Sequence, residues 1–350
     1  MRVVIALAPV LLFIGLLLLL DSFKLVRLRA VLQAIAAGAF AALLALAVNL
    51  ALLDRLGLEL AAFTRYGAPG IEEGLKAGWV LFLIRRQRVG FLVDAAILGF
   101  AVGAGFALVE NVDYLEHVES AGLSLWFARG CGTAVLHGAT TATVAVLGKN
   151  AHDRRPGFAA FLPGLLIAIL IHSLFNHFVL PPLMSALVLL ATLPLLLIFV
   201  FHRAEKTTRE WLSGEFDGEL QMLQEIRAGQ VAHTRTGAYL ESLKTRFEGT
   251  LVADMLCLLQ IQLELKVRAK GILMAREAGI DLPVGEDVRD NLKELHYLQS
   301  QIGRTGLIAM RPILSLNSRD IWQLSMMEEA GRTGGSSSAA ATSGAATSPD

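Results

Sequence analysis

Seven apolar stretches occupy almost all of the chain before residue 202, and short polar loops separate them. They cover roughly residues 3–20, 31–53, 67–84, 91–116, 122–147, 158–180 and 182–201. A helix needs about 20 apolar residues to cross the hydrocarbon core of a membrane. Of all residues, 54% are hydrophobic and 18% are charged, against about 45–50% and about 25% in soluble domains. The sequence therefore predicts an all-α polytopic membrane bundle of about seven transmembrane helices.

Lysine and arginine are distributed unevenly among the polar segments. Basic residues are frequent in every second segment, namely 21–30, 85–90, 148–157 and the stretch that begins at 203. The alternate loops, 54–66 and 112–121, are balanced or acidic. Cytoplasmic loops of membrane proteins carry the excess of Lys and Arg. We therefore expect the N terminus outside the membrane and the C terminus in the cytoplasm.

The chain after the last apolar stretch has a different character. Residues 203–330 carry apolar side chains at helical spacing, first between Tyr239 and Glu277 and again over about 286–303. We expect a cytoplasmic helical domain, whose stripes form either a plain helical core or a surface for a cytoplasmic partner. Residues 331–350 lack large apolar side chains, which predicts a disordered tail. The expected division is thus 1–202, 203–330 and 331–350.

Ionisable and amide side chains interrupt four of the apolar stretches. They are Glu72 and Glu73, Glu110 and Asn111, His137, and His172 and Asn176. A charge at the bilayer centre costs about 2.5–3.5 kcal/mol on insertion scales, so such residues usually serve a function. At about 1.5 Å per residue, Glu72, Glu110 and His172 lie roughly 8, 9 and 12 Å below the predicted outer boundary. The same estimate places His137 roughly 22 Å deep, which favours a structural role for it.

These residue types at one level suit the activation of water. One of the adjacent glutamates can polarise a water molecule while the other holds a cation, with Lys76 and Arg129 as candidates. His172 can orient the water or share its proton, and the Asn176 amide can donate to a developing oxyanion. We therefore expect an intramembrane hydrolase whose site lies toward the outer leaflet.

Four motifs in order carry a family resemblance. They are EEGLK at 72–76, FALVEN at 106–111, His137 on the next stretch, and HSLFN at 172–176. This pattern resembles the PrsW family of intramembrane proteases, relatives of type II CAAX prenyl endopeptidases and bacteriocin-processing membrane enzymes. The resemblance covers about residues 60–180. It implies a bacterial inner-membrane endopeptidase that cuts membrane-protein substrates near the outer leaflet, such as an anti-sigma-type factor.

The resemblance allows either a zinc-dependent or a metal-free mechanism. Catalytic zinc takes three protein ligands and water, and Glu110, His137 and His172 are the candidate ligands. The HExxH signature is absent, and the depth of His137 argues against this set. The preferred interpretation needs no cofactor: Glu72 activates water with His172, Glu73 and Glu110 tune the site, and Asn176 stabilises the oxyanion. Lys76, Asn111, Arg129 and His137 are expected to support these residues.

A non-enzymatic transporter or sensor is the main alternative, because buried Glu and His residues also form proton pathways. A transporter would place its site near the midplane and often shows internal repeats. Here the cluster is expected toward one face, and the sequence shows no repeat. The expected partners are a membrane-protein substrate and the lipid bilayer. The formal net charge is zero, so charge gives no support for nucleic-acid binding.

Overall fold

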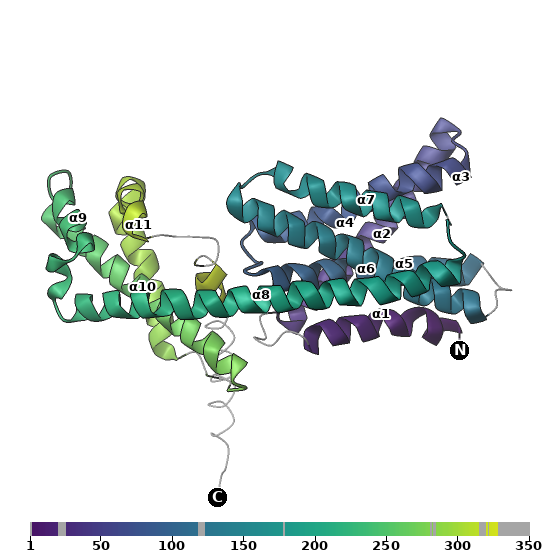
Figure 1. The fold of residues 1–350 in the computed structure, drawn as a ribbon. Helices are drawn as coiled ribbons and strands as arrows, with labels where there is room; N and C mark the ends of the chain where they lie inside the picture. The colour runs from purple at the N-terminus through teal and green to yellow at the C-terminus, as the bar shows by residue number, and fades with distance from the viewer. Residues whose placement is uncertain are drawn as a thin grey trace, which may run out of the picture. The chain divides into compact units, whose positions relative to one another are not determined.

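The computed structural model describes residues 2–19, 26–117, 123–177, 179–280, 282, 285–314, 320 and 322–327. Every element in these ranges is a helix, so the all-α prediction is confirmed for them (Figure 1). The chain divides into two compact units, Met1–Lys206 and Thr207–Asp350. The tail expected at 331–350 lies outside the described residues.

The first unit is a bundle of long helices joined by short turns. Its elements are α1 (Arg2–Leu19), α2 (Leu28–Leu56), α3 (Leu60–Ala62), the π-helical turn η1 (Phe63–Gly67), α4 (Ala68–Arg85), α5 (Leu92–His117), α6 (Leu123–Arg154), the 3₁₀ turn η2 (Phe158–Phe161), α7 (Leu162–Asn176) and the first part of α8 (Pro182–Arg227). Glycine ends α2, because Gly57 adopts a left-handed φ of 56° and its N–H bonds the Leu53 carbonyl. Proline suits the first turn of α4, where its missing N–H costs no helical bond.

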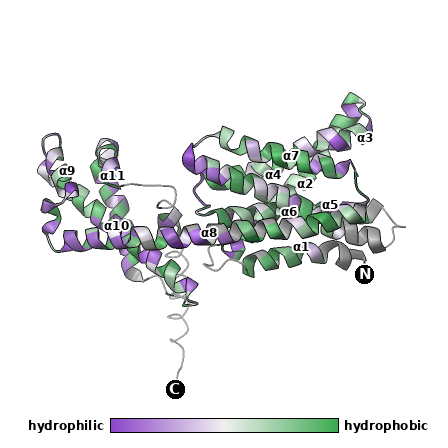
Figure 2. Cartoon of the chain, viewed as in Figure 1, coloured by the Kyte–Doolittle hydropathy of each residue, from purple (hydrophilic) through white to green (hydrophobic). Residues whose placement is uncertain are grey.

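Four of the described helices are long and apolar enough to cross a membrane, which supports an integral membrane protein. They are Leu28–Leu56, Leu92–Leu115, Gly130–Arg154 and Phe158–Asn176. Figure 2 shows apolar residues along these helices. Helix α4 is not among them, because Glu72, Glu73 and Lys76 add charge to it. The number of seven transmembrane helices therefore stays a prediction.

Helix α5 lies at the centre of the first unit and packs against α1, α2, α4 and α6. Glycines let the helices approach closely at two of these contacts. A Cβ on Gly38 of α2 would lie 1.8 Å from the Val102 carbonyl oxygen of α5. A Cβ on Gly103 of α5 would lie 1.9 Å from the His137 carbonyl oxygen of α6. The backbones of α2, α5 and α6 are thus held together at the level of the polar cluster.

Helix α7 is attached to the bundle differently. Its buried residues are Gly164, Ala168 and His172, which recur every fourth position and form one narrow stripe. Of its apolar span 22% is buried, against 83% for the spans in α5 and α6. Most of α7 therefore faces away from the protein core, while the stripe carries His172 inward.

The second unit contains the end of α8, the turn η3 (Gln230–His233), α9 (Arg235–Leu243), α10 (Gly249–Glu277) and α11 (Glu286–Leu314). The expected boundary at residue 202 falls inside α8, which runs on to Arg227. The apolar run after Tyr239 is divided between α9 and α10. Helix α11 continues beyond its expected end because Gly303, at a φ of 67°, forms a kink rather than a stop.

Candidate active site

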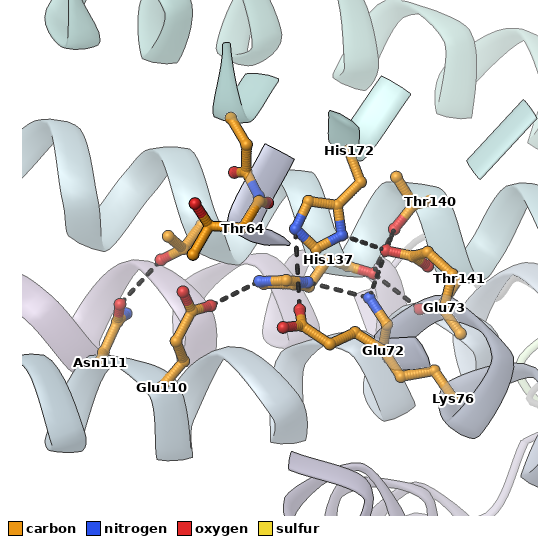
Figure 3. Close-up of polar contacts among 12 residues, drawn as sticks. Thr64, Glu72, Glu73, Lys76, Glu110, Asn111, His137, Thr140, Thr141 and His172 are labelled. Atoms are coloured by element: carbon orange, nitrogen blue, oxygen red, sulfur yellow. Dashed lines mark hydrogen bonds and ion pairs between the residues drawn. The ribbon is translucent and has the colours of Figure 1, made fainter. Parts of the chain in front are cut away.

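Glu73 of α4 is the most heavily bonded carboxylate of the cluster. Its Oε1 atom accepts hydrogen bonds from Lys76 Nζ at 2.7 Å, His172 Nδ1 at 2.8 Å and Thr140 Oγ1 at 3.2 Å. These donors come from α4, α7 and α6, so one oxygen atom ties three helices together (Figure 3). The Glu73 side chain has no solvent exposure. We infer that Glu73 fixes the positions of its neighbours.

Glu72 lies beside this network and keeps contact with the surface. Its side chain is 16% exposed. Asn49 Nδ2 of α2 donates to Glu72 Oε1 at 3.2 Å. The other oxygen, Oε2, lies 3.7 Å from His172 Nε2. Glu72 therefore has one oxygen held by α2 and the other directed toward a histidine nitrogen.

The protonation of His172 follows from its partners. An ionised carboxylate only accepts hydrogen bonds, so His172 Nδ1 carries the proton that it donates to Glu73. In the neutral ring Nε2 is then an acceptor, and it faces Glu72. The distance of 3.7 Å is too long for a direct hydrogen bond. A water molecule that contacts both atoms would meet two proton acceptors.

His137 of α6 lies within the cluster, although its estimated depth set it apart from the other motif residues. Its ring lies 4.9 Å from the His172 ring, centroid to centroid. Lys76 Nζ donates to His137 Nδ1 at 2.9 Å, and His137 Nε2 lies 2.6 Å from Glu110 Oε2. The sequence estimate placed His137 deeper than Glu110 and His172, whereas the structure brings these side chains into contact. Helix α6 has 32 residues, and at about 1.5 Å per residue it is longer than the membrane core, so its first turns need not lie in lipid.

The second motif, residues 106–111, contributes an aromatic contact and an interhelical hydrogen bond as well as Glu110. Phe106 is buried, and the centroid of its ring lies 4.8 Å from that of the His137 ring. Lys76 Nζ lies 4.8 Å from the centroid of the Phe106 ring. Asn111 Oδ1 accepts a hydrogen bond of 2.8 Å from Thr133 Oγ1 of α6. The first contact places a cation over an aromatic face. The second joins α5 to α6 at the residue next to Glu110.

Asn176 and its neighbour Ser173 make bonds away from the carboxylates. Asn176 Nδ2 donates to the Thr64 carbonyl at 2.9 Å, and Ser173 Oγ donates to the Arg65 carbonyl at 2.7 Å. Both acceptors belong to η1 or its edge, just before α4. The end of α7 thus holds the π-helical turn that leads to Glu72. The side chain of Arg129 lies outside the described residues.

The pairing of Lys76 also differs from simple spacing. Glu72 lies four residues before Lys76, a spacing that places two side chains on the same face of a helix. In the structure its ammonium bonds Glu73, three residues earlier. Both spacings bring helical side chains together. The bonds of Glu73 to His172 and Thr140 hold its carboxylate between α6 and α7. The Lys76 ammonium bonds the same carboxylate oxygen there.

Sequence reasoning missed three participants. Asn49 is one of two amides in the apolar stretch 31–53, the other being Gln33 near its start, and this interruption was a usable signal. Thr133 and Thr140 gave none, because threonine is common in apolar helices and bonds its own helix backbone. The Thr140 hydroxyl bonds both Glu73 and its own helix backbone, since it also lies 3.3 Å from the His137 carbonyl. These residues are partners of the motif side chains rather than members of the motifs.

The residue types fit a zinc ion, provided that Lys76 Nζ leaves His137 Nδ1, since Nε2 of that ring is bonded to Glu110. Ligand atoms of Glu72, His137 and His172 lie within 4.8 Å of one another, and two imidazoles with a carboxylate are a common catalytic zinc set. The bond from His172 Nδ1 to Glu73 matches the outer-shell carboxylate that orients a zinc-bound histidine. The sequence named Glu110 in place of Glu72. The structure instead groups Glu72 with the histidines.

Comparison with known proteins agrees with this geometry. The family model described as PrsW family intramembrane metalloprotease matches residues 26–202, just over half of the chain. The chain belongs to the PrsW family. The match runs from α2 to the first part of α8, so every helix that contributes a side chain to the cluster lies inside it. No curated protein and no solved structure gives a significant match. As a PrsW-family protein the chain is a membrane protease, and its reaction class is hydrolysis.

Proposed function

We propose that the chain is an intramembrane endopeptidase that hydrolyses a peptide bond of a membrane-protein substrate near the outer leaflet. The observation that carries this proposal is the sequence of contacts Glu73–His172–Glu72, at 2.8 and 3.7 Å. In this arrangement Glu72 Oε2 and His172 Nε2 are two proton acceptors for one water molecule. Glu73 fixes the orientation of the His172 ring through Nδ1. The expected setting is a bacterial inner membrane with the C terminus in the cytoplasm, and an anti-sigma-type factor is one candidate substrate.

In the proposed reaction Glu72 acts as general base. Its Oε2 takes a proton from the water whose oxygen attacks the scissile carbonyl carbon. The same proton then passes to the leaving amide nitrogen as the carbon–nitrogen bond breaks, so Glu72 ends ionised as it began. His172 holds the water through Nε2. Glu73 is assigned no proton transfer in this scheme; it holds Lys76, Thr140 and His172 through its Oε1 atom.

The oxyanion and metal questions follow from the same residues. The Asn176 amide bonds the Thr64 carbonyl, so it has to leave η1 to reach an oxyanion. We propose that substrate binding shifts η1 and releases this amide. In the metal-dependent alternative, Glu72, His137 and His172 would hold a zinc ion, which would act as a Lewis acid toward water and carbonyl. Glu72 and His172 would then be ligands, and Glu72 would not be the general base. Glu110 then keeps its place as the partner of His137.

The test compares membrane-protein fragments in cells that express the wild type, Glu72→Gln or His172→Ala at equal levels. Glu59→Gln is the matched control, because Glu59 is an exposed glutamate at the start of α3. Fragments cut near the outer leaflet should appear with the wild type and the control and be absent from both site variants. Identical fragment profiles in all four strains would contradict the peptidase proposal. Proton flux through the same carboxylates would then be measured as the alternative.

A further inference from the structure

The second unit contains a pocket that the proposed peptidase reaction does not use. It has a volume of about 430 Å³ and is lined by α8, α10 and the end of α11, all within Thr207–Asp350. Leucine, isoleucine and methionine side chains form most of its wall. Its polar lining consists of Glu215, Glu219, Gln262, Lys266 and Asp320. This volume suits a small organic molecule.

Buried charges are concentrated at the polar end. Lys266 Nζ lies 3.0 Å from Asp320 Oδ2 and 3.9 Å from Glu219 Oε1. Lys270 Nζ, just behind, lies 2.7 Å from Glu219 Oε2 and 3.3 Å from Glu215 Oε2. The two lysine side chains are 6% and 0% exposed. Among these five described side chains, the three carboxylates outnumber the two ammonium groups by one.

Gln262 of α10 gives a second, independent indication of a ligand. It is 2% exposed, and its Oε1 atom has no hydrogen-bond partner among the described residues. It also lines the pocket. A buried amide oxygen without a donor is unfavourable. A ligand N–H group in the pocket would supply the missing donor.

We propose that this pocket binds a small amphipathic monocation, a primary ammonium or guanidinium group on a short aliphatic body. The charged head would neutralise the excess carboxylate charge and donate to Gln262 Oε1. The aliphatic body would lie against the apolar wall. Burial raises the pKa of the Glu219 carboxyl, an effect that Lys270 opposes. A further cation beside Glu219 would therefore favour its ionised form.

A divalent metal ion is the competing occupant. Carboxylate oxygens of Glu215, Glu219 and Asp320 lie within 4.8 Å of one another, as a metal site requires. The same carboxylates already hold two ammonium groups at 2.7 and 3.0 Å. A doubly charged ion would be repelled by both lysines more strongly than a single charge. The apolar wall would also have no role. The observations therefore favour the monocation.

The test measures binding to the full chain in detergent micelles by titration calorimetry, with butylammonium, butyrate and calcium as probes. We expect saturable binding of butylammonium and none of butyrate or calcium. Gln262→Leu should weaken butylammonium binding at least tenfold, and Gln262→Glu should strengthen it by adding one negative charge. Glu241→Gln is the control, because Glu241 is an exposed acid that pairs with Lys244 and does not line the pocket.

A melting measurement shows that the variants remain folded. Gln262→Leu removes an unpartnered buried oxygen, so its melting temperature should not fall below that of the wild type. Three results would overturn the proposal: no binding of butylammonium to the wild type, equal binding to Gln262→Leu, or preferential binding of calcium. The inference is independent of the peptidase proposal, because no residue of the α4–α7 cluster takes part in it.

Discussion

The Glu73 carboxylate and the Lys76 ammonium lie 2.7 Å apart, and neither side chain has any solvent exposure. The two residues are three positions apart on α4, and the polar cluster of α4, α6 and α7 is arranged around them. A buried ion pair is seldom retained for stability, because desolvation offsets most of the attraction. Here each partner also bonds a histidine, Glu73 to His172 and Lys76 to His137. The pair thus sets the orientation of both imidazoles.

Removing the cation alone should be severe. Lys76→Met leaves the Glu73 carboxylate buried without its ammonium, and loss of one partner of such a pair costs about 3–5 kcal/mol. We expect a lower melting temperature in detergent and no proteolysis. The double variant Glu73→Gln, Lys76→Met should recover most of the melting temperature but no activity. Equal destabilisation by the single and double variants would show that the pair does not act as a unit.

Asn49 should act as a positioning residue for Glu72. Asn49→Leu removes the 3.2 Å bond to Glu72 Oε1, and misplacement of a reacting group by about 1 Å can cost 10²-fold in rate. We expect kcat to fall by about that factor while KM changes little, since the substrate-binding surface is intact. Thr143→Val is the control, because its hydroxyl bonds only the Ala139 carbonyl of its own helix in the described contacts. A change confined to KM would argue against this role.

Variants of Asn176 and Ser173 distinguish a role in the reaction from a role in holding η1. Both side chains bond the η1 backbone, but only Asn176 is proposed to reach the oxyanion. Loss of an oxyanion donor lowers kcat by about 10²–10³. Asn176→Ala should therefore lose that factor, while Ser173→Ala should lose far less. If the two variants are impaired alike, the shared contact with η1 explains both, and the oxyanion role is wrong.

The close approach of α5 and α6 predicts a contrast between two glycines. Gly103→Ala places a Cβ against the His137 carbonyl, and overpacking typically costs about 1–3 kcal/mol. It should lower the melting temperature and the activity together, because His137 shifts with its backbone. At Gly78 of α4 a Cβ would meet nothing within 4 Å, so Gly78→Ala should leave both unchanged. Similar behaviour of the two variants would contradict the packing described for α5.

Metal dependence can be decided without knowing the substrate. If Glu72, His137 and His172 hold zinc, the purified chain should bind about one equivalent, and His137→Ala should abolish binding. Loss of an outer-shell carboxylate typically costs 10–100-fold in affinity, so Glu73→Gln should weaken it by about that factor. Metal analysis and competition with a chromophoric chelator measure both effects. Proteolysis that survives exhaustive chelation would instead support the metal-free glutamate mechanism.

Much of this site could be anticipated from residue type and spacing. Glu72, Glu73 and His172 cost free energy in lipid, and that cost indicated a common polar cluster. Depth along one helix was a poorer guide. For His137 the depth estimate did not indicate its contacts with Lys76 and Glu110, because the sequence does not show where a helix longer than the membrane leaves it. The contact of Asn49 with Glu72 depends on the packing of α2 against α4, which periodicity does not reveal.

The second unit shows the same limit. Apolar spacing after Tyr239 identified helical structure but gave no reason for the break between α9 and α10. Gly303 has a φ that favours glycine, and such a residue ends many helices. In α11 the chain instead resumes its helix after the kink, because Met310 and Leu314 are buried in the core of this unit. Burial of side chains far along the chain decided the outcome.

The single stripe that joins α7 to the bundle has a consequence for how a substrate arrives. His172 lies on a helix whose apolar span is 22% buried, against 83% for the spans in α5 and α6. In the proposed reaction, a transmembrane segment that diffuses in the plane of the bilayer would reach His172 from the side, past α7. Substrate selection would then depend on whether a segment is more stable in the polar cluster or in the surrounding lipid. A segment whose backbone unwinds readily gains more from the polar cluster than from the surrounding lipid.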